Sequence, residues 1–384
     1  MKKIYSKETL VKFLNSRNNE GEIDLQLYNG SIEFKNGIET IEYILNNFDD
    51  FKKSVKNVTI TIPYEKLPRD VFAHICELNK KLEDNNIQLD IGVNHTFDYG
   101  YTRVQTLYWD VNTIIKANTE INKVCDFIKE KNFSPLEALA YVHDYVSTIT
   151  AYKQTGEKHA WYDKDQHFAG AFLNLPEFVC MGYSTLMKEI IDNLNMPGLS
   201  CDVIVVEFNH LKKSTLEGHA RCFVKVKDDK YGVDQTAFDD PTWDNNKELN
   251  HEFAHFVMPN DAHDKKRSKM YEYDCPEKVI FSNKKASIEI ADDYLYSERY
   301  NHSKNQIDQL MIEKVYFNIL KKSNKNASFD EIYNILTKMV KDSFAEQEQR
   351  EYEGNLISNK PLLSREEAAK DYKLDDNIEE ENLI

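Results

Sequence analysis

The chain lacks any long uninterrupted run of apolar residues. No window of its 384 residues approaches the roughly 18 consecutive apolar residues that a membrane-spanning helix needs. The first residues, MKKIYSKETLVKFLNSRNNEG, include lysines but have neither the apolar core nor the small-residue cleavage site of a secretory signal. We therefore expect a cytoplasmic protein with no membrane partner.

Basic residues are too few to balance the acidic ones. The 49 lysines and arginines stand against 65 aspartates and glutamates, which leaves a formal charge of −16. Affinity for nucleic acids depends largely on basic side chains that neutralise phosphates, so the composition predicts no nucleic-acid partner. The hydrophobic share of 41% is typical of a folded protein with a core of its own.

Cysteines are also sparse, and no two of them form a CxxC pair. This spacing disfavours both a zinc ribbon and a framework of disulfides. We interpret five of the six as reduced, buried thiols and single out Cys180. The six positions are Cys76, Cys125, Cys180, Cys201, Cys222 and Cys275.

The spacing of apolar residues divides the chain into four expected regions. A strand–helix–strand order near the N-terminus predicts a small α/β module, in which alternating residues on either side of Asn29-Gly30 predict a hairpin. Helical patterns surround a central region that contains the candidate chemistry. The expected regions are the N-terminal α/β module (1–110), a catalytic domain (111–275), a helical region (276–345) and an acidic, flexible tail (346–384).

Cys180 is expected at the first turn of a core-facing helix. Apolar residues recur at helical spacing from Tyr183 to Leu194, which places the cysteine at the N-terminal end. Free backbone N–H groups and the helix dipole stabilise a thiolate at this position and can face an oxyanion. A lone cysteine is more often a small core residue, so the assignment as a nucleophile depends on partners.

Two partners are expected on a hairpin that follows. Residues alternate along the strand that begins at His219, Asp228-Asp229 is the expected turn, and the chain returns through Asp234. In a simple two-residue hairpin, His219 and Asp234 share one face of the sheet, although several residues separate them and a bulge would have to bring them together. A histidine that accepts the thiol proton, oriented by a carboxylate, is the known logic of a catalytic triad.

These residues resemble the motifs of the transglutaminase-like superfamily over roughly residues 134–265. The motifs are Cys180-Met-Gly-Tyr-Ser184, His219-Ala220 and Asp234-Gln-Thr-Ala-Phe-Asp239. The resemblance implies an α+β, papain-like core in which a helix bearing the cysteine packs on an antiparallel sheet. It also implies the triad Cys180, His219 and Asp234, without a cofactor or metal, acting on a protein or peptide through an acyl-thioester.

The resemblance leaves two positions open. Asp240-Pro-Thr-Trp-Asp244 is a second match to the aspartate motif, but Asp234 keeps the family's fifteen-residue step from His219 and is preferred. Gln166 and Asn174 are chemically able to donate a hydrogen bond to an oxyanion, and nothing in the sequence chooses between them.

Two functions of other classes remain as alternatives. His251-Glu252-Phe-Ala-His255 is an HExxH string, which on a helix would bind zinc, but Pro259 leaves little room for such a helix. The second alternative is a non-catalytic, protein-binding scaffold with the same fold. The sequence does not distinguish hydrolysis from deamidation or cross-linking, and it does not reveal the oligomeric state.

Overall fold

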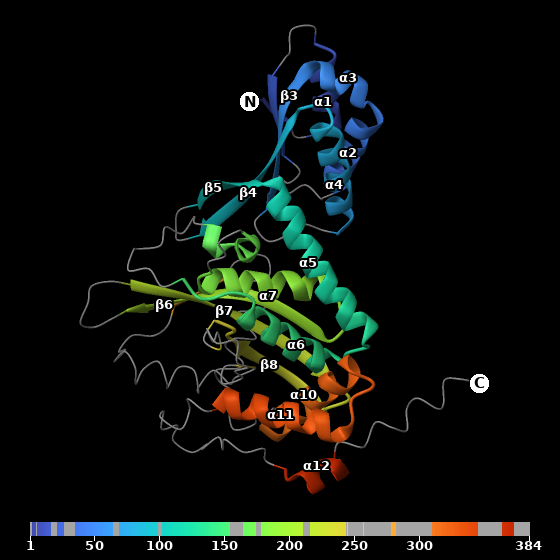
Figure 1. The fold of residues 1–384 in the computed structure, drawn as a ribbon. Coiled ribbons are helices and arrows are strands. Elements are labelled where there is room, and N and C mark those ends of the chain that lie inside the picture. Colours follow the sequence, from blue (N-terminus) through green and yellow to red (C-terminus); the bar gives the residue numbers. More distant parts are fainter. Residues whose placement is uncertain are drawn as a thin grey trace. The chain divides into compact units, whose positions relative to one another are not determined.

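The computed structural model (Figure 1) divides the chain into two compact units, each described here by itself. The first unit comprises Met1–Lys123 and Thr155–Pro176, and the second comprises Val124–Gln154 and Glu177–Ile384. The first break between the units, between Lys123 and Val124, falls inside a helix. The sequence suggested a boundary at residue 110. The residues that the structure describes are 2–4, 6–16, 21–26, 35–63, 69–98, 102–153, 164–173, 178–209, 216–242, 244, 256, 278–281, 309–344 and 363–371.

The first unit contains a five-stranded mixed sheet. Its strands lie in the order of the chain, with parallel pairing through the first four and antiparallel pairing of the last two. Parallel neighbours need crossover connections, and the helices between the strands supply them. The strands are β1 (Lys2–Ile4), β2 (Gly21–Gln26), β3 (Val55–Pro63), β4 (Gln88–Asp98) and β5 (Thr102–Asp110).

Helices α1 to α4 lie on one side of this sheet (Figure 1). Their apolar stripes cover alternate strand residues that are fully buried, such as Ile23, Ile60 and Ile91, as expected when one sheet face packs on helices. The helices of the unit are α1 (Lys7–Leu14), α2 (Lys35–Asn46), α3 (Phe48–Ser54), α4 (Arg69–Glu83), the first part of α5 (Val111–Glu130), and the short 3-10 helices η1 (Lys164–Gln166) and η2 (Phe168–Phe172).

The hairpin expected around Asn29-Gly30 would follow strand β2 directly. Strand β2 pairs in parallel with β1 on one side and with β3 on the other. Among the described residues, both neighbours of β2 are therefore parallel strands. The turn itself lies outside the described residues.

The second unit is built on a four-stranded antiparallel sheet. The strand order is β8-β7-β6-β9, and its longest pairing joins β6 and β7. Strands β7 and β8 form a hairpin whose turn covers residues 229–232, two residues longer than the expected turn. The strands are β6 (Leu199–Asn209), β7 (Leu216–Asp228), β8 (Val233–Asp239) and β9 (Lys278–Phe281).

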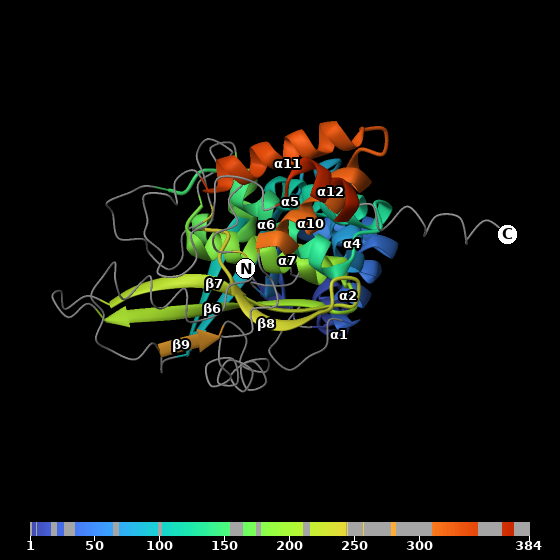
Figure 2. The ribbon, with the colours of Figure 1, turned by 90° about the horizontal axis from the view of Figure 1, so that it is seen from below.

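The helices of the second unit gather on one side of that sheet (Figure 2). Helix α7 contacts β6 and β7, α6 packs on α7, and α10 packs on α6 and α11. The helices are the last part of α5, α6 (Pro135–Thr148), α7 (Cys180–Leu194), α10 (Gln309–Ser323), α11 (Phe329–Phe344) and α12 (Arg365–Asp371). Helix α12 falls within the region expected to be a flexible tail.

A buried carboxylate joins several of these elements. Glu137, in the first turn of α6, has a fully buried side chain that accepts hydrogen bonds from Lys230 (3.1 Å) and Lys322 (2.7 Å). The Tyr231 hydroxyl donates a third at 2.8 Å. Since an uncompensated buried charge is costly, these contacts hold the β7–β8 turn and α10 against the start of α6.

Among the described helices, none is both long and apolar enough to cross a membrane. The described residues form a mixed α/β structure, and in the second unit the helix that begins at Cys180 packs on the antiparallel sheet.

Candidate active site

Helix α7 begins at Cys180, as its apolar spacing predicts. Val179 before it is extended, with φ −115° and ψ 175°, and its carbonyl accepts the first helical hydrogen bonds, from Gly182 and Tyr183. Nearly every residue from Met181 to Ile191 is buried, so the helix lies within the core of its unit. The helix ends at Leu194 and is capped by Asn195, which adopts the left-handed conformation (φ 47°) common at helix C-termini.

The chain that leads into Cys180 is held by the segment that follows helix α6. Tyr152 forms a parallel bridge with Phe178, and the Lys153 N–H donates to the Phe178 carbonyl at 2.7 Å. The Tyr183 hydroxyl in turn donates to the Thr150 carbonyl at 2.7 Å. These contacts fix the approach to α7, and hence the position of its first residue.

Cys180 differs from the other described thiols of its unit because it is partly exposed. Cys125, Cys201 and Cys222 are buried, whereas Cys180 has intermediate exposure. Its thiol is hydrogen-bonded to the His219 side chain and to the backbone N–H of Ala220. Cys180 therefore has a basic partner, and the residue as a whole is less buried than the other three cysteines.

His219 lies between the thiol and a buried carboxylate. The His219 Nε2 is 2.6 Å from the Asp240 Oδ2, and the Asp240 side chain is fully buried. Because Nε2 is engaged by Asp240, Nδ1 is the ring nitrogen left for Cys180. The structure thus brings together Cys180, His219 and Asp240 at the start of α7, in β7 and just beyond the end of β8.

Asp234 does not reach His219, which corrects the expected triad. Asp234 pairs with Lys227 in the β7–β8 ladder, and its exposed carboxylate is 3.8 Å from the Lys227 Nζ. His219 lies eight residues from Lys227 along the same strand, which corresponds to about 27 Å at ~3.4 Å per residue. The expected shared face is compatible with this register, but strand length makes the contact impossible.

Asp240 is well placed by the same register. Cys222 pairs with Asp239 at the end of the ladder, so a continued ladder would set Asp240 opposite Arg221, two residues from His219. Diagonal neighbours at that separation are within reach of long side chains. The second match in the sequence, Asp240-Pro-Thr-Trp-Asp244, contained the carboxylate that contacts the histidine.

The electrostatics of the three groups favour an ion pair. Burial alone lowers the pKa of His219, but the charge and hydrogen bond of Asp240, together with smaller contributions from Cys180, outweigh it and raise the pKa to about 9. Burial likewise raises the pKa of the Cys180 thiol, yet the His219 hydrogen bond and charge and the Ala220 N–H bring it below its ordinary value. A thiolate beside an imidazolium is therefore favoured, and a helix N-terminus supports the thiolate further.

A second buried histidine lies next to this group. The His143 Nδ1 is 2.6 Å from the Asp239 Oδ1, and the His143 Nε2 is 3.1 Å from the Asp244 Oδ2. All three side chains are fully buried. Sequence reasoning missed His143, although it falls at helical spacing within the apolar stripe of Leu139, Val142 and Val146, where a histidine needs polar partners.

The other residues considered from the sequence contribute less. Gln166 is buried in η1 of the first unit, and Asn174 lies outside the described residues, as does the HExxH string at 251–255. Arg221 is fully buried, with its guanidinium carbon 3.9 Å from the centre of the Phe238 ring. Within the described part of the chain, no group of three or more histidine, cysteine, aspartate or glutamate side chains is arranged to hold a metal ion.

No model of a known protein family matches the chain, and no curated protein or solved structure is significantly similar to it. The resemblance to transglutaminase-like enzymes therefore depends on the short motifs alone. The geometry of Cys180, His219 and Asp240 is a separate observation that does not depend on that resemblance.

Proposed function

We propose that the protein is a cysteine enzyme that cleaves a carboxamide or peptide bond through an acyl-thioester on Cys180, with a transglutaminase-like core. The observation that carries the proposal is the chain of contacts from the Cys180 thiol to His219 and from His219 Nε2 to the buried Asp240 at 2.6 Å. This order of nucleophile, base and orienting carboxylate is what covalent acyl transfer requires.

The first half of the proposed reaction forms the thioester. The Cys180 thiolate attacks the carbonyl carbon, and the carbonyl oxygen becomes an oxyanion near the free N–H groups at the start of α7. The C–N bond then breaks, and the His219 imidazolium gives its proton to the departing amine. Asp240 keeps the ring oriented and stabilises its charged form.

The second half releases the acyl group. Neutral His219 takes a proton from water, or from an incoming amine, as that molecule attacks the thioester carbon. The C–S bond breaks, and the thiolate and imidazolium are restored. Hydrolysis, deamidation and amine transfer share these steps and differ in which nucleophile enters, and the proposal covers a protein or peptide substrate without choosing among them.

Acylation with p-nitrophenyl acetate tests the nucleophile directly. We expect a burst of nitrophenolate close to one equivalent and one acetyl group added to the intact protein. Both signals should be lost in Cys180→Ala, which removes the attacking atom. Cys76→Ala is the matched control, because Cys76 is also of intermediate exposure but burial raises the pKa of its thiol, so this variant should keep the burst.

Persistence of the burst and the acetyl adduct in Cys180→Ala would refute the proposal. Absence of a burst in the unmodified protein, together with slow alkylation typical of an ordinary thiol, would favour the non-catalytic scaffold instead.

A further inference from the structure

The segment from Asp239 to Asp244 carries the carboxylate of the proposed site at its second residue, Asp240, and its first and last residues are both anchored. Asp239, the last residue of β8, and Asp244 both bind the ring of His143 in α6, at 2.6 Å and 3.1 Å. Asp240 follows the first anchor directly and turns to His219 instead. Neighbouring aspartates therefore bind two different histidines.

We propose that His143 is a positioning residue, which closes the 239–244 segment and so holds the Asp240 carboxylate on His219. The inference rests on the proposed function, because Asp240 matters to the reaction only through His219. His143 itself acts through Asp239 and Asp244 and is assigned no contact with a substrate.

The charges around His143 stabilise its contacts with Asp239 and Asp244. Burial alone lowers the pKa of His143, but the charges and hydrogen bonds of Asp239 and Asp244 raise it well above its ordinary value. An imidazolium between two fully buried carboxylates compensates charges that would otherwise be costly to bury. Each of its two ring nitrogens is bonded, so the ring cannot rotate without breaking both contacts.

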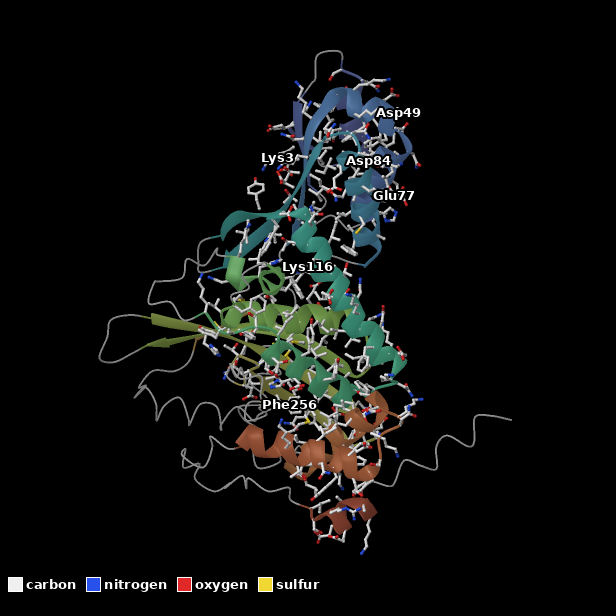
Figure 3. The ribbon with its side chains drawn as sticks, viewed as in Figure 1. Lys3, Asp49, Glu77, Asp84, Lys116 and Phe256 are labelled. Atoms are coloured by element: carbon white, nitrogen blue, oxygen red, sulfur yellow. The ribbon has the colours of Figure 1, made fainter. Side chains whose placement is uncertain are left out.

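Two aromatic residues of the described part of the chain lie near His143. Phe256, labelled in Figure 3, packs edge-on to the His143 ring, with ring centres 5.3 Å apart and planes at 73°. Tyr316 of α10 donates its hydroxyl to the Ala140 carbonyl, one turn earlier in α6, at 3.0 Å, and the negative charges of Asp144, Asp239 and Asp244 add to burial in raising the pKa of that hydroxyl. The acidic partners of the ring are thus Asp239 of β8 and Asp244, while α10 contributes a neutral tyrosine.

The experiment follows the His219 ring by NMR titration of histidine-labelled protein, with His219→Gln used to assign its signal. If His143 positions Asp240, His143→Gln should lower the midpoint of the His219 titration by about one pH unit or more, because the opposite charge and hydrogen bond that raise this pKa are weakened. Asp244→Asn, which removes one of the two anchors, should shift it less in the same direction.

Glu137→Gln is the matched control. Glu137 is a fully buried, ion-paired group at the other end of the same helix, so this variant loses stability without touching the 239–244 segment. We expect the His219 midpoint to stay unchanged in it. Comparison at equal folded fraction, monitored by circular dichroism, separates positioning from a general loss of stability.

Three results would overturn the inference. One is a folded His143→Gln protein whose His219 titrates as in the unmodified chain. Another is a rise of the midpoint, since loss of a nearby positive charge without movement of Asp240 would stabilise the imidazolium. The third applies if His143→Gln does not fold: an unchanged midpoint of the His219 titration in Asp244→Asn would then overturn the inference. The readout does not use the thiol, so it is independent of whether Cys180 forms an acyl-enzyme.

Discussion

Replacing Asp240 by asparagine should slow alkylation of Cys180 far more than the same change at Asp234. The structure places Asp240 on the His219 ring and leaves Asp234 exposed beside Lys227. The pKa of His219 is raised from 6.5 to about 9, with Asp240 the main cause of the increase. Asparagine can still accept the ring hydrogen bond but has no charge to stabilise the imidazolium.

The size of the effect follows from that pKa. A nearby opposite charge changes a pKa by about one to three units. Without the carboxylate the pKa of His219 should therefore fall by about one unit or more, while the hydrogen bond and charge of Cys180 still raise it. The thiolate–imidazolium pair should therefore be at least about tenfold less populated in Asp240→Asn.

The assay is the rate of iodoacetamide reaction at Cys180 between pH 5 and 10, followed by mass spectrometry of the peptide that contains it. Asp240→Asn should move the rise of the profile to higher pH and lower the rate at pH 7.5 about tenfold or more. Asp234→Asn should match the unmodified protein within about twofold, because exposed ion pairs contribute little. Equal profiles for the two variants would refute the assignment of Asp240.

Two further predictions concern stability. Because the folded pKa of His219 is about 9 and its ordinary value is 6.5, its contribution is fully present below about pH 6.5 and is lost as the pH rises through about 9. The difference in unfolding free energy between the unmodified protein and His219→Gln should therefore fall by about 3 kcal/mol over that window in urea titrations, and a difference independent of pH would contradict it. Gly198 has a φ of +85°, and a Cβ there would lie 2.5 Å from the Lys227 carbonyl oxygen, whereas Gly232 has a φ of +65° and open space around it. Gly198→Ala should cost about 3 kcal/mol or more and Gly232→Ala about 1 kcal/mol by the same measurement, and equal costs would show that the close contact at Gly198 is unimportant.

Helix positions were largely readable from the sequence. The apolar spacing predicted the N-terminal end of α7 at Cys180 and a helical region over 276–345, in which the structure has α10 and α11. Helical periodicity depends on neighbours three and four residues apart, so local sequence carries it. The cysteine at a helix start was recognisable for the same reason. The histidine was recognisable from the alternation of residues along its strand, which is also a local pattern.

Strand pairing was less readable. The alternation around Asn29-Gly30 suggested an antiparallel hairpin, which lies outside the described residues, and nothing in it predicted the parallel pairing of β2 with β1 and β3. Alternation shows which residues share a face, not which strand lies alongside. Parallel partners are brought in by helices between them, and that choice is made by packing of the whole unit.

The carboxylate of the site shows the same division between sequence and structure. Local sequence determined Cys180, His219 and the two aspartate motifs, and even the shared face of His219 and Asp234. Only the tertiary structure showed that Asp240, and not Asp234, contacts His219. The length of β7 separates Asp234 from the histidine, whereas the end of β8 places Asp240 beside it. His143 was equally beyond the sequence, since its partners are about one hundred residues away along the chain and a buried charge is explained only by the groups that the fold places around it.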